Sequence, residues 1–153
     1  MINCYSCGVS GIDAYIVNIE ADSQRALPAY DVVGLADTAI KESKERVRSG
    51  IKNCGFEFPP KKLTLNLAPA AIKKDGTHYD LAMAIAVLGT FDNINTDNLQ
   101  NYVILGELSL SGEVRGVSGI LPMSDEAYKQ GYKNIIVPND NKKEAALIPN
   151  LKV

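Results

Sequence analysis

KKDGTHYDLAMAIAVL, residues 73–88, joins a polar loop to an uninterrupted apolar segment. The segment from Leu81 to Leu88 is apolar all round and only about two helical turns long. This pattern predicts a central helix over residues 80–88 that is buried on most sides. Gly89 is expected to end the helix, and His78 to lie at its entrance.

The segments around this helix alternate between strand and helix patterns. The clearest helix follows the N-cap residue Asp37 and ends at Gly55, with an apolar stripe that recurs every three to four residues. Its opposite face carries charged side chains, which include Arg46. Ser111-Gly112 predicts a tight turn within a hairpin. A third helix is expected over residues 120–130, with Met123, Ala127 and Tyr128 facing inward. Strands are expected within 2–20 (two strands) and at 27–34, 63–67, 102–105, 108–110 and 134–138, and a short helix at 141–147.

This order of elements predicts one α/β domain over residues 1–153. Early strands followed by alternating helices and strands indicate an α+β two-layer sandwich with a mixed sheet. The length and the 46% of apolar residues suffice for a hydrophobic core. No apolar run reaches the roughly 18 residues of a membrane span, and no signal peptide begins the chain, so we expect a cytoplasmic location and no membrane partner.

Three cysteines leave two interpretations open. Cys4 and Cys7 form a C-x-x-C pair that Cys54 and His78 could complete as a Cys₃His zinc site. Against this, residues three apart in a strand point to opposite faces, and Cys54 continues the apolar stripe of the first helix. We therefore expect three free thiols without metal.

The charge is distributed unevenly along the chain. Residues 41–74 contain nine basic and three acidic residues, a net charge of +6, whereas the remainder carries seven basic and fifteen acidic residues, a net charge of −8. The block is either a surface for an anionic partner such as DNA or the solvated face of one helix. The candidate anion or DNA contacts are Lys41, Lys44, Arg48, Lys61, Lys62, Lys73 and Lys74.

The loop at residues 73–80 resembles the loop that opens the active site of Lon-type Ser/Lys proteases. In that resemblance the serine position falls on His78, and the lysine position falls on Leu121, at the end of Ser118-Gly119-Ile120-Leu121. Covalent catalysis by such a pair needs a hydroxyl that a nearby base activates. His78 and Leu121 are therefore interpreted as vestigial positions, and the chain is not expected to be an enzyme.

Several longer blocks together resemble the N-terminal domain of the magnesium-chelatase-like YifB/ComM family of AAA+ ATPases. They are residues 11–15, 32–43, 45–48, 66–70 and 106–112. The resemblance implies the Lon-protease-like fold, which is similar to a ribosomal-protein domain with a left-handed βαβ crossover. It also implies that an ATPase module follows in the parent protein, where ATP and magnesium are used. This chain has no G-x-x-x-x-G-K-[ST] motif and is expected to bind no cofactor itself.

The function that follows is that of a non-catalytic accessory domain. Its expected partners are its own AAA+ module, neighbouring subunits of a homo-hexamer, and a substrate that is either protein or DNA. One alternative is a Lon-like hydrolase with rearranged residues, in which His78 acts as general base with Asp80 nearby in sequence, while serines 109, 111 and 118 lie in the turn-rich strand region. The other is a weak phosphate or nucleotide site, formed by the backbone N–H groups that start the 80–88 helix with Lys73, Lys74, Thr77 and His78.

Overall fold

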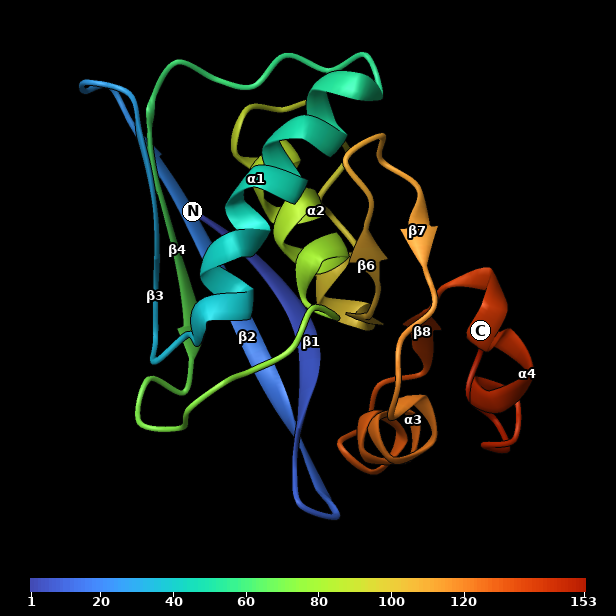
Figure 1. Ribbon diagram of the computed structural model, residues 1–153. Helices are drawn as coiled ribbons and strands as arrows, with labels where there is room; N and C mark the ends of the chain where they lie inside the picture. Colours follow the sequence, from blue (N-terminus) through green and yellow to red (C-terminus); the bar gives the residue numbers. More distant parts are fainter.

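A six-stranded mixed sheet runs through the computed structural model, which describes all 153 residues (Figure 1). The strand order is β3-β4-β2-β1-β5-β8. The β1–β2 and β2–β4 pairs are antiparallel, whereas the β3–β4, β1–β5 and β5–β8 pairs are parallel. The predicted α/β class with a mixed sheet is confirmed. The strands are β1 (Ile2–Ser10), β2 (Asp13–Gln24), β3 (Ala29–Val33), β4 (Lys62–Ala68), β5 (Tyr102–Ile104) and β8 (Asn134–Ile136).

Two helices, α1 (Thr38–Asn53) and α2 (Asp80–Thr90), lie against one face of this sheet (Figure 1). The alternating residues Leu63, Leu65 and Leu67 of β4 point to this face and are fully buried. The core here contains 19 buried residues. Most residues of α2 are buried in this core, as its sequence predicts, and the others are partly exposed.

The opposite face of the sheet carries a second, smaller core. Helices α3 (Ile120–Lys129) and α4 (Lys142–Ala145) contribute to it together with residues of β1, β5 and β8. Cys4 belongs to the first core and Cys7 to the second, so the expectation that they point to opposite faces of β1 is confirmed. The structure thus adds a partial third layer to the predicted two-layer sandwich.

Local signals position α1 as expected. The Asp37 carboxylate accepts a hydrogen bond of 2.9 Å from the Ile40 N–H, as an N-cap residue should. Gly55 follows the helix with a φ of +89°. Before the helix, Gly34 has a φ of +102°, and a Cβ atom there would lie 2.3 Å from the Leu67 carbonyl oxygen. This close approach lets the loop before α1 pack against the end of β4.

Two local expectations are wrong. Gly89 lies inside α2, which continues to Thr90, and a Cβ atom there would lie 3.0 Å from Thr96 and 3.2 Å from Ile2. This glycine permits a close contact of α2 with its neighbours instead of ending the helix. Tyr128 is 42% exposed and points away from the core, whereas Met123 and Ala127 are buried as expected.

The remaining elements connect these layers. The predicted hairpin is present as the antiparallel pair β6 (Glu107–Leu108) and β7 (Val114–Arg115). Two short 3-10 helices, η1 (Leu99–Asn101) and η2 (Asn139–Asn141), precede β5 and α4. Strand β3 forms one edge of the sheet, with Pro28 directly before it. None of the helices combines the length and apolar character needed to cross a membrane.

Candidate functional site

The start of α2 is fixed by backbone hydrogen bonds to the segment that leads into β6. The Gly106 N–H donates to the His78 carbonyl at 2.9 Å, and the Leu81 N–H donates to the Gly106 carbonyl at 3.0 Å. The side chain of Thr77 donates to the Glu107 carboxylate at 2.5 Å. These contacts hold residues 77–81 in one conformation, so the positions of His78 and Asp80 follow from the fold.

His78 is held against β1. Its Nε2 atom lies 2.8 Å from the Cys7 carbonyl oxygen, and its ring lies over that of Tyr79 with 4.1 Å between the centroids. A carbonyl oxygen only accepts, so Nε2 carries the proton and the lone pair of the neutral ring is on Nδ1. Burial lowers the pKa of His78, while the bond to Cys7 and the charge of Asp75 oppose this shift. His78 is therefore a neutral, anchored side chain at the entrance of α2.

No activated nucleophile lies beside this histidine. The ring of His78 is hydrogen-bonded to the backbone of Cys7, and the thiol of Cys7 donates to the Met123 carbonyl oxygen at 3.6 Å. Burial raises the pKa of this thiol to about 12, so it stays protonated. The hydroxyl of Ser109 pairs with that of Ser111 at 2.8 Å within the β6–β7 turn, and the Ser118 side chain forms no hydrogen bond. The serines that the hydrolase alternative requires are not bonded to His78.

Asp80, the carboxylate near His78 in the hydrolase alternative, is bound to α1 and not to His78. Its carboxylate accepts hydrogen bonds from Arg46 Nε at 2.7 Å and Nη2 at 3.1 Å, and from the Leu108 N–H at 3.0 Å. Burial raises the pKa of Asp80, and the Arg46 guanidinium opposes that shift. Arg46 also donates to the Ala39 carbonyl. Asp80 thus connects α2, α1 and β6, and it has no free oxygen directed at the histidine.

Lys74 is fully buried, which corrects its assignment as a surface contact for an anion. Its amine donates to the carbonyl oxygens of Gly34, at 2.8 Å, and Pro69. No carboxylate pairs with it, and burial lowers its pKa. The Lys74 backbone also bonds to Leu35 and Asp37. The residue fastens the loop before α2 to the loop before α1.

The proposed phosphate cradle at the start of α2 is occupied by the protein itself. The Leu81 N–H is bonded to Gly106, Thr77 is bonded to Glu107, and the Asp80 carboxylate already lies in the first turn. Of the residues considered for that cradle, only Lys73 is exposed. A negative carboxylate in the first turn takes the place that an anion would take at a helix N-terminus.

Leu121, the position of the lysine in the protease resemblance, lies in the first turn of α3. Its side chain is 39% exposed, and its N–H donates to the Glu144 carboxylate at 3.1 Å. The neighbouring Ile120 is fully buried in the second core. A leucine side chain can neither donate a proton nor accept one.

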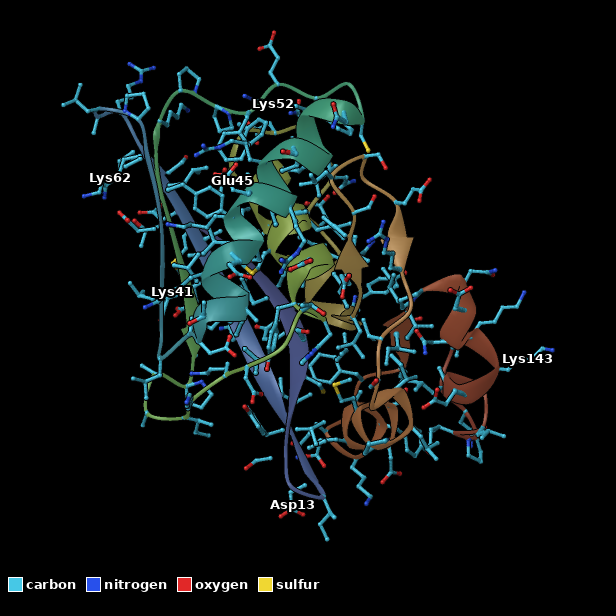
Figure 2. All side chains as sticks on the ribbon, in the orientation of Figure 1. Asp13, Lys41, Glu45, Lys52, Lys62 and Lys143 are labelled. Carbon is cyan, nitrogen blue, oxygen red and sulfur yellow. The ribbon has the colours of Figure 1, made fainter.

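The remaining basic residues divide into separate groups. Arg48 lies over the Phe58 ring at 5.2 Å and, with Lys52 and Lys61, lines a cavity of about 350 Å³ beside the start of β3. We call these three residues the basic groove. Lys41 and Lys52 lie towards opposite ends of α1, and Lys62 projects away from that helix (Figure 2). Lys44 is half-buried and donates to the Tyr30 carbonyl at 3.2 Å.

Sequence reasoning missed the structural roles of Arg46 and Lys74. Arg46 lies three residues after the buried Ser43 and four before the buried Gly50, which places it beside the apolar stripe of α1. That spacing was the available signal for an inward arginine. Lys74 had no comparable signal, because its partners are backbone carbonyls. The structure shows no group of three or more His, Cys, Asp or Glu side chains that could hold a metal ion.

Comparisons with known proteins extend the description of the chain. A family model described as subunit ChlI of Mg-chelatase matches residues 19–141. The chain is 44% identical to the uncharacterized protein YifB of Escherichia coli over 138 residues, which is 90% of the chain and 27% of YifB. It is 36% identical to competence protein ComM of Haemophilus influenzae over 144 residues, 94% of the chain and 28% of ComM.

A more distant similarity reaches the proteases. The chain is 24% identical to Lon protease of Trichlorobacter lovleyi over 147 residues, which is 92% of the chain and 18% of the protease. It therefore spans less than a third of the length of YifB, ComM and this protease.

Proposed function

The chain belongs to the family of Mg-chelatase subunit ChlI, among the relatives of YifB and ComM, and from this premise we propose that it is a non-catalytic accessory domain of an AAA+ ATPase. The domain contacts neighbouring subunits or a substrate, while the ATPase chemistry belongs to the remaining part of the parent protein. In this proposal ATP and magnesium are used there, and this chain itself contains no phosphate-binding loop motif.

One observation carries the non-catalytic part of the proposal. The Nε2–H of His78 donates to the Cys7 carbonyl oxygen. Burial raises the pKa of the Cys7 thiol, so this thiol stays protonated. The Asp80 carboxylate is bound by Arg46, and Leu121 has no amine. A nucleophilic mechanism needs a hydroxyl or thiol bonded to a base, and this arrangement supports the absence of that pair.

Incubation of the purified chain with an unfolded protein substrate tests this point. We expect no cleavage above the buffer control and no covalent labelling by a fluorophosphonate probe. His78→Ala should behave in the same way. Cleavage that the wild-type chain performs and His78→Ala loses would contradict the proposal and favour the rearranged hydrolase.

The basic groove and Lys41 support an anionic substrate, for which DNA is the candidate. Cationic side chains that contact phosphates release counterions, so binding falls steeply as salt rises. Four contacts, at Lys41, Arg48, Lys52 and Lys61, would give a log–log slope of about −3.6 on duplex DNA; Lys44, whose amine is bonded to Tyr30, and Lys62, which projects away from α1, are not counted. Affinity for the isolated chain should be weak, because a ring of subunits multiplies the contacts of a single patch.

Charge reversal with a matched control tests the DNA contact. Lys41→Glu combined with Lys61→Glu should weaken duplex binding and reduce the magnitude of the salt slope by about 1.8. The control is Lys142→Glu with Lys143→Glu, two exposed lysines of α4, far from Lys41 in Figure 2. Equal effects of the two double variants, or no binding at low salt, would contradict the proposed DNA contact. The basic groove would then be assigned to contacts between subunits.

A further inference from the structure

A cavity of about 580 Å³ is formed where β1, η1 and the segment between α3 and β8 meet, and no residue of α1 or α2 lines it. This size is within the range of small-molecule sites. Its lining residues are Tyr5, Gln100, Asn101, Gln130, Gly131, Tyr132, Lys133 and Asn134.

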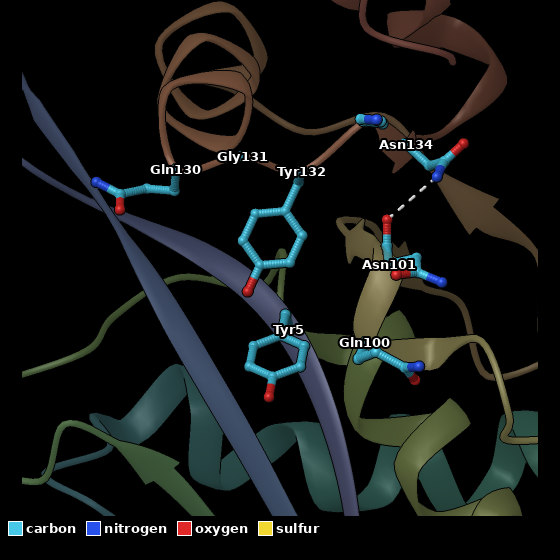
Figure 3. Close-up of a pocket in the computed structure, with 8 residues that line it drawn as sticks. Tyr5, Gln100, Asn101, Gln130, Gly131, Tyr132 and Asn134 are labelled. Atoms are coloured by element: carbon cyan, nitrogen blue, oxygen red, sulfur yellow. Dashed lines mark hydrogen bonds between the residues drawn. The ribbon is translucent and has the colours of Figure 1, made fainter.

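The lining combines two aromatic rings with amide side chains. The rings of Tyr5 and Tyr132 lie 5.7 Å apart between their centroids at an angle of 48°. Figure 3 shows them between Gln130 on one side and Asn101 and Asn134 on the other. Each residue comes from a segment that the fold holds in place. Tyr5 pairs with Val103 in the sheet, and Asn134 Nδ2 donates to the Asn101 carbonyl at 3.3 Å.

Much of the hydrogen-bonding capacity of this cavity is unused. The hydroxyls of Tyr5 and Tyr132 and the side-chain amides of Gln100 and Asn101 form no hydrogen bond within the protein. Gln130 donates through Nε2 to Glu126 at 2.7 Å, so its carbonyl oxygen stays free. The cavity therefore offers donors and acceptors side by side, next to aromatic faces.

The charge at the cavity is positive and comes from few residues. Lys133 is the only charged lining residue, and no carboxylate lines the cavity. Lys152 lies beside it, because its N–H donates to the Lys133 carbonyl at 2.9 Å. Both lysines are exposed and neither forms an ion pair. The cavity offers no carboxylate to balance the charge of a divalent cation, and an apolar ligand would leave the amides without partners.

We propose that this cavity binds a nucleobase, carried by a free nucleotide or by a single strand. Bases stack on tyrosine rings, and asparagine and glutamine amides match the adjacent donor and acceptor groups of a base edge. Lys133, which lines the cavity, would meet the attached phosphate. This site is separate from the basic groove and binds the base, whereas the groove binds the phosphate backbone without regard to base.

Binding of a ten-nucleotide oligo(dT) to the 153-residue chain tests the site. The chain has seven tyrosines and no tryptophan, so its intrinsic tyrosine fluorescence reports contact with a base. Tyr5→Ala should weaken binding by about fivefold to a hundredfold. Gln100→Ala with Asn101→Ala changes two exposed side chains and should weaken it about twofold to tenfold. Asn98→Ala, just before η1 and outside the cavity, is the matched control and should change nothing.

An abasic oligomer of the same length separates this site from the DNA contact proposed above. It should bind the wild-type chain at least as weakly as oligo(dT) binds Tyr5→Ala, because it lacks the base for both the ring and the amide contacts. Charge reversal at Lys41 and Lys61 should weaken both oligomers equally, so either proposal can fail alone. Competition by thymidine monophosphate would identify free nucleotide as the ligand, and competition by the strand alone would identify single-stranded nucleic acid. Equal binding of the two oligomers, or unchanged binding by both cavity variants, overturns the inference.

Discussion

His78 shows how one side chain at the entrance of a buried helix becomes a structural group. Its neutral form donates to the Cys7 carbonyl, and burial keeps its pKa below the ordinary value of 6.5. The unfolded chain therefore binds a proton more readily than the folded chain does. The stability that this difference supplies is complete above about pH 6.5 and is lost as the pH falls through the folded pKa.

We expect the free energy of unfolding to decrease between pH 7.5 and pH 5.5, by at most about 1.4 kcal/mol for each pH unit from this one group. His78→Gln retains an N–H donor but does not titrate, so its stability should depend less on pH over this interval. Urea unfolding of both proteins at several pH values measures the effect. Parallel pH profiles for the two proteins would refute the role given to His78.

The candidate site was predictable at the residue scale only in part. The loop resemblance led to His78 and Leu121, and the sequence alone shows that these two positions hold neither serine nor lysine. Arg46 and Lys74 were counted as surface charges, because charged residues are rarely buried without a partner. Their partners are a carboxylate 34 residues away in the chain and two backbone carbonyls, and only the fold brings these groups together.

The Arg46–Asp80 pair links the two helices that cover the larger core. The Asp80 side chain is almost fully buried and that of Arg46 is 21% exposed. Loss of one partner leaves the other charge buried and uncompensated, which destabilises proteins by about 3–5 kcal/mol. Arg46→Met should therefore lower the free energy of unfolding by roughly that amount, as measured by urea denaturation.

Arg48→Met provides the comparison on the same helix. Arg48 pairs at 3.7 Å with the exposed Glu45 and lies over the Phe58 ring, and contacts of these two kinds near the surface contribute about 0–1 kcal/mol each. If Arg46→Met lowers the free energy of unfolding by no more than Arg48→Met does, the Arg46–Asp80 pair contributes nothing to stability beyond a surface contact. Combining Arg46→Met with Asp80→Asn should recover part of the loss, because the second change removes the buried charge.

Helix α1 was predictable as an element because its signals are local. Asp37, the apolar stripe and Gly55 lie within one continuous segment. The prediction that Gly89 ends α2 was wrong because glycine occurs both at helix ends and at close contacts inside helices. A glycine after an apolar run resembles a helix end, but here it allows Ile2 and Thr96 to approach α2. Contacts between distant segments leave no local pattern.

The whole molecule contains two cores of unequal size on the two faces of one sheet. The first has 19 buried residues and the second has nine. Regions with fewer buried contacts open at a lower free energy than global unfolding requires. We expect the amides of α3 to exchange with solvent through such a partial opening, while those of α2 exchange only on global unfolding. Native-state hydrogen exchange at low denaturant concentrations measures both.

A core substitution in each layer provides the control for this comparison. Met83 and Met123 are both fully buried, so truncation of either one destabilises the core around it. Met123→Ala should increase the rate of amide exchange in α3 and leave α2 protected. Met83→Ala should increase amide exchange throughout the chain. Identical opening free energies for α2 and α3 in the unmodified chain would show that the two cores unfold as one unit.

The edge strand β3 also affects how the protein behaves at high concentration. One side of β3 pairs with β4, and the other side has backbone N–H and C=O groups without a strand partner. Such an edge can recruit strands from other molecules and start aggregation. Here the strand is only five residues long, Pro28 precedes it, and the exposed Asp31 lies at its centre. These features discourage strand addition, so Asp31→Val would favour self-association through this edge even where the fold itself is unchanged.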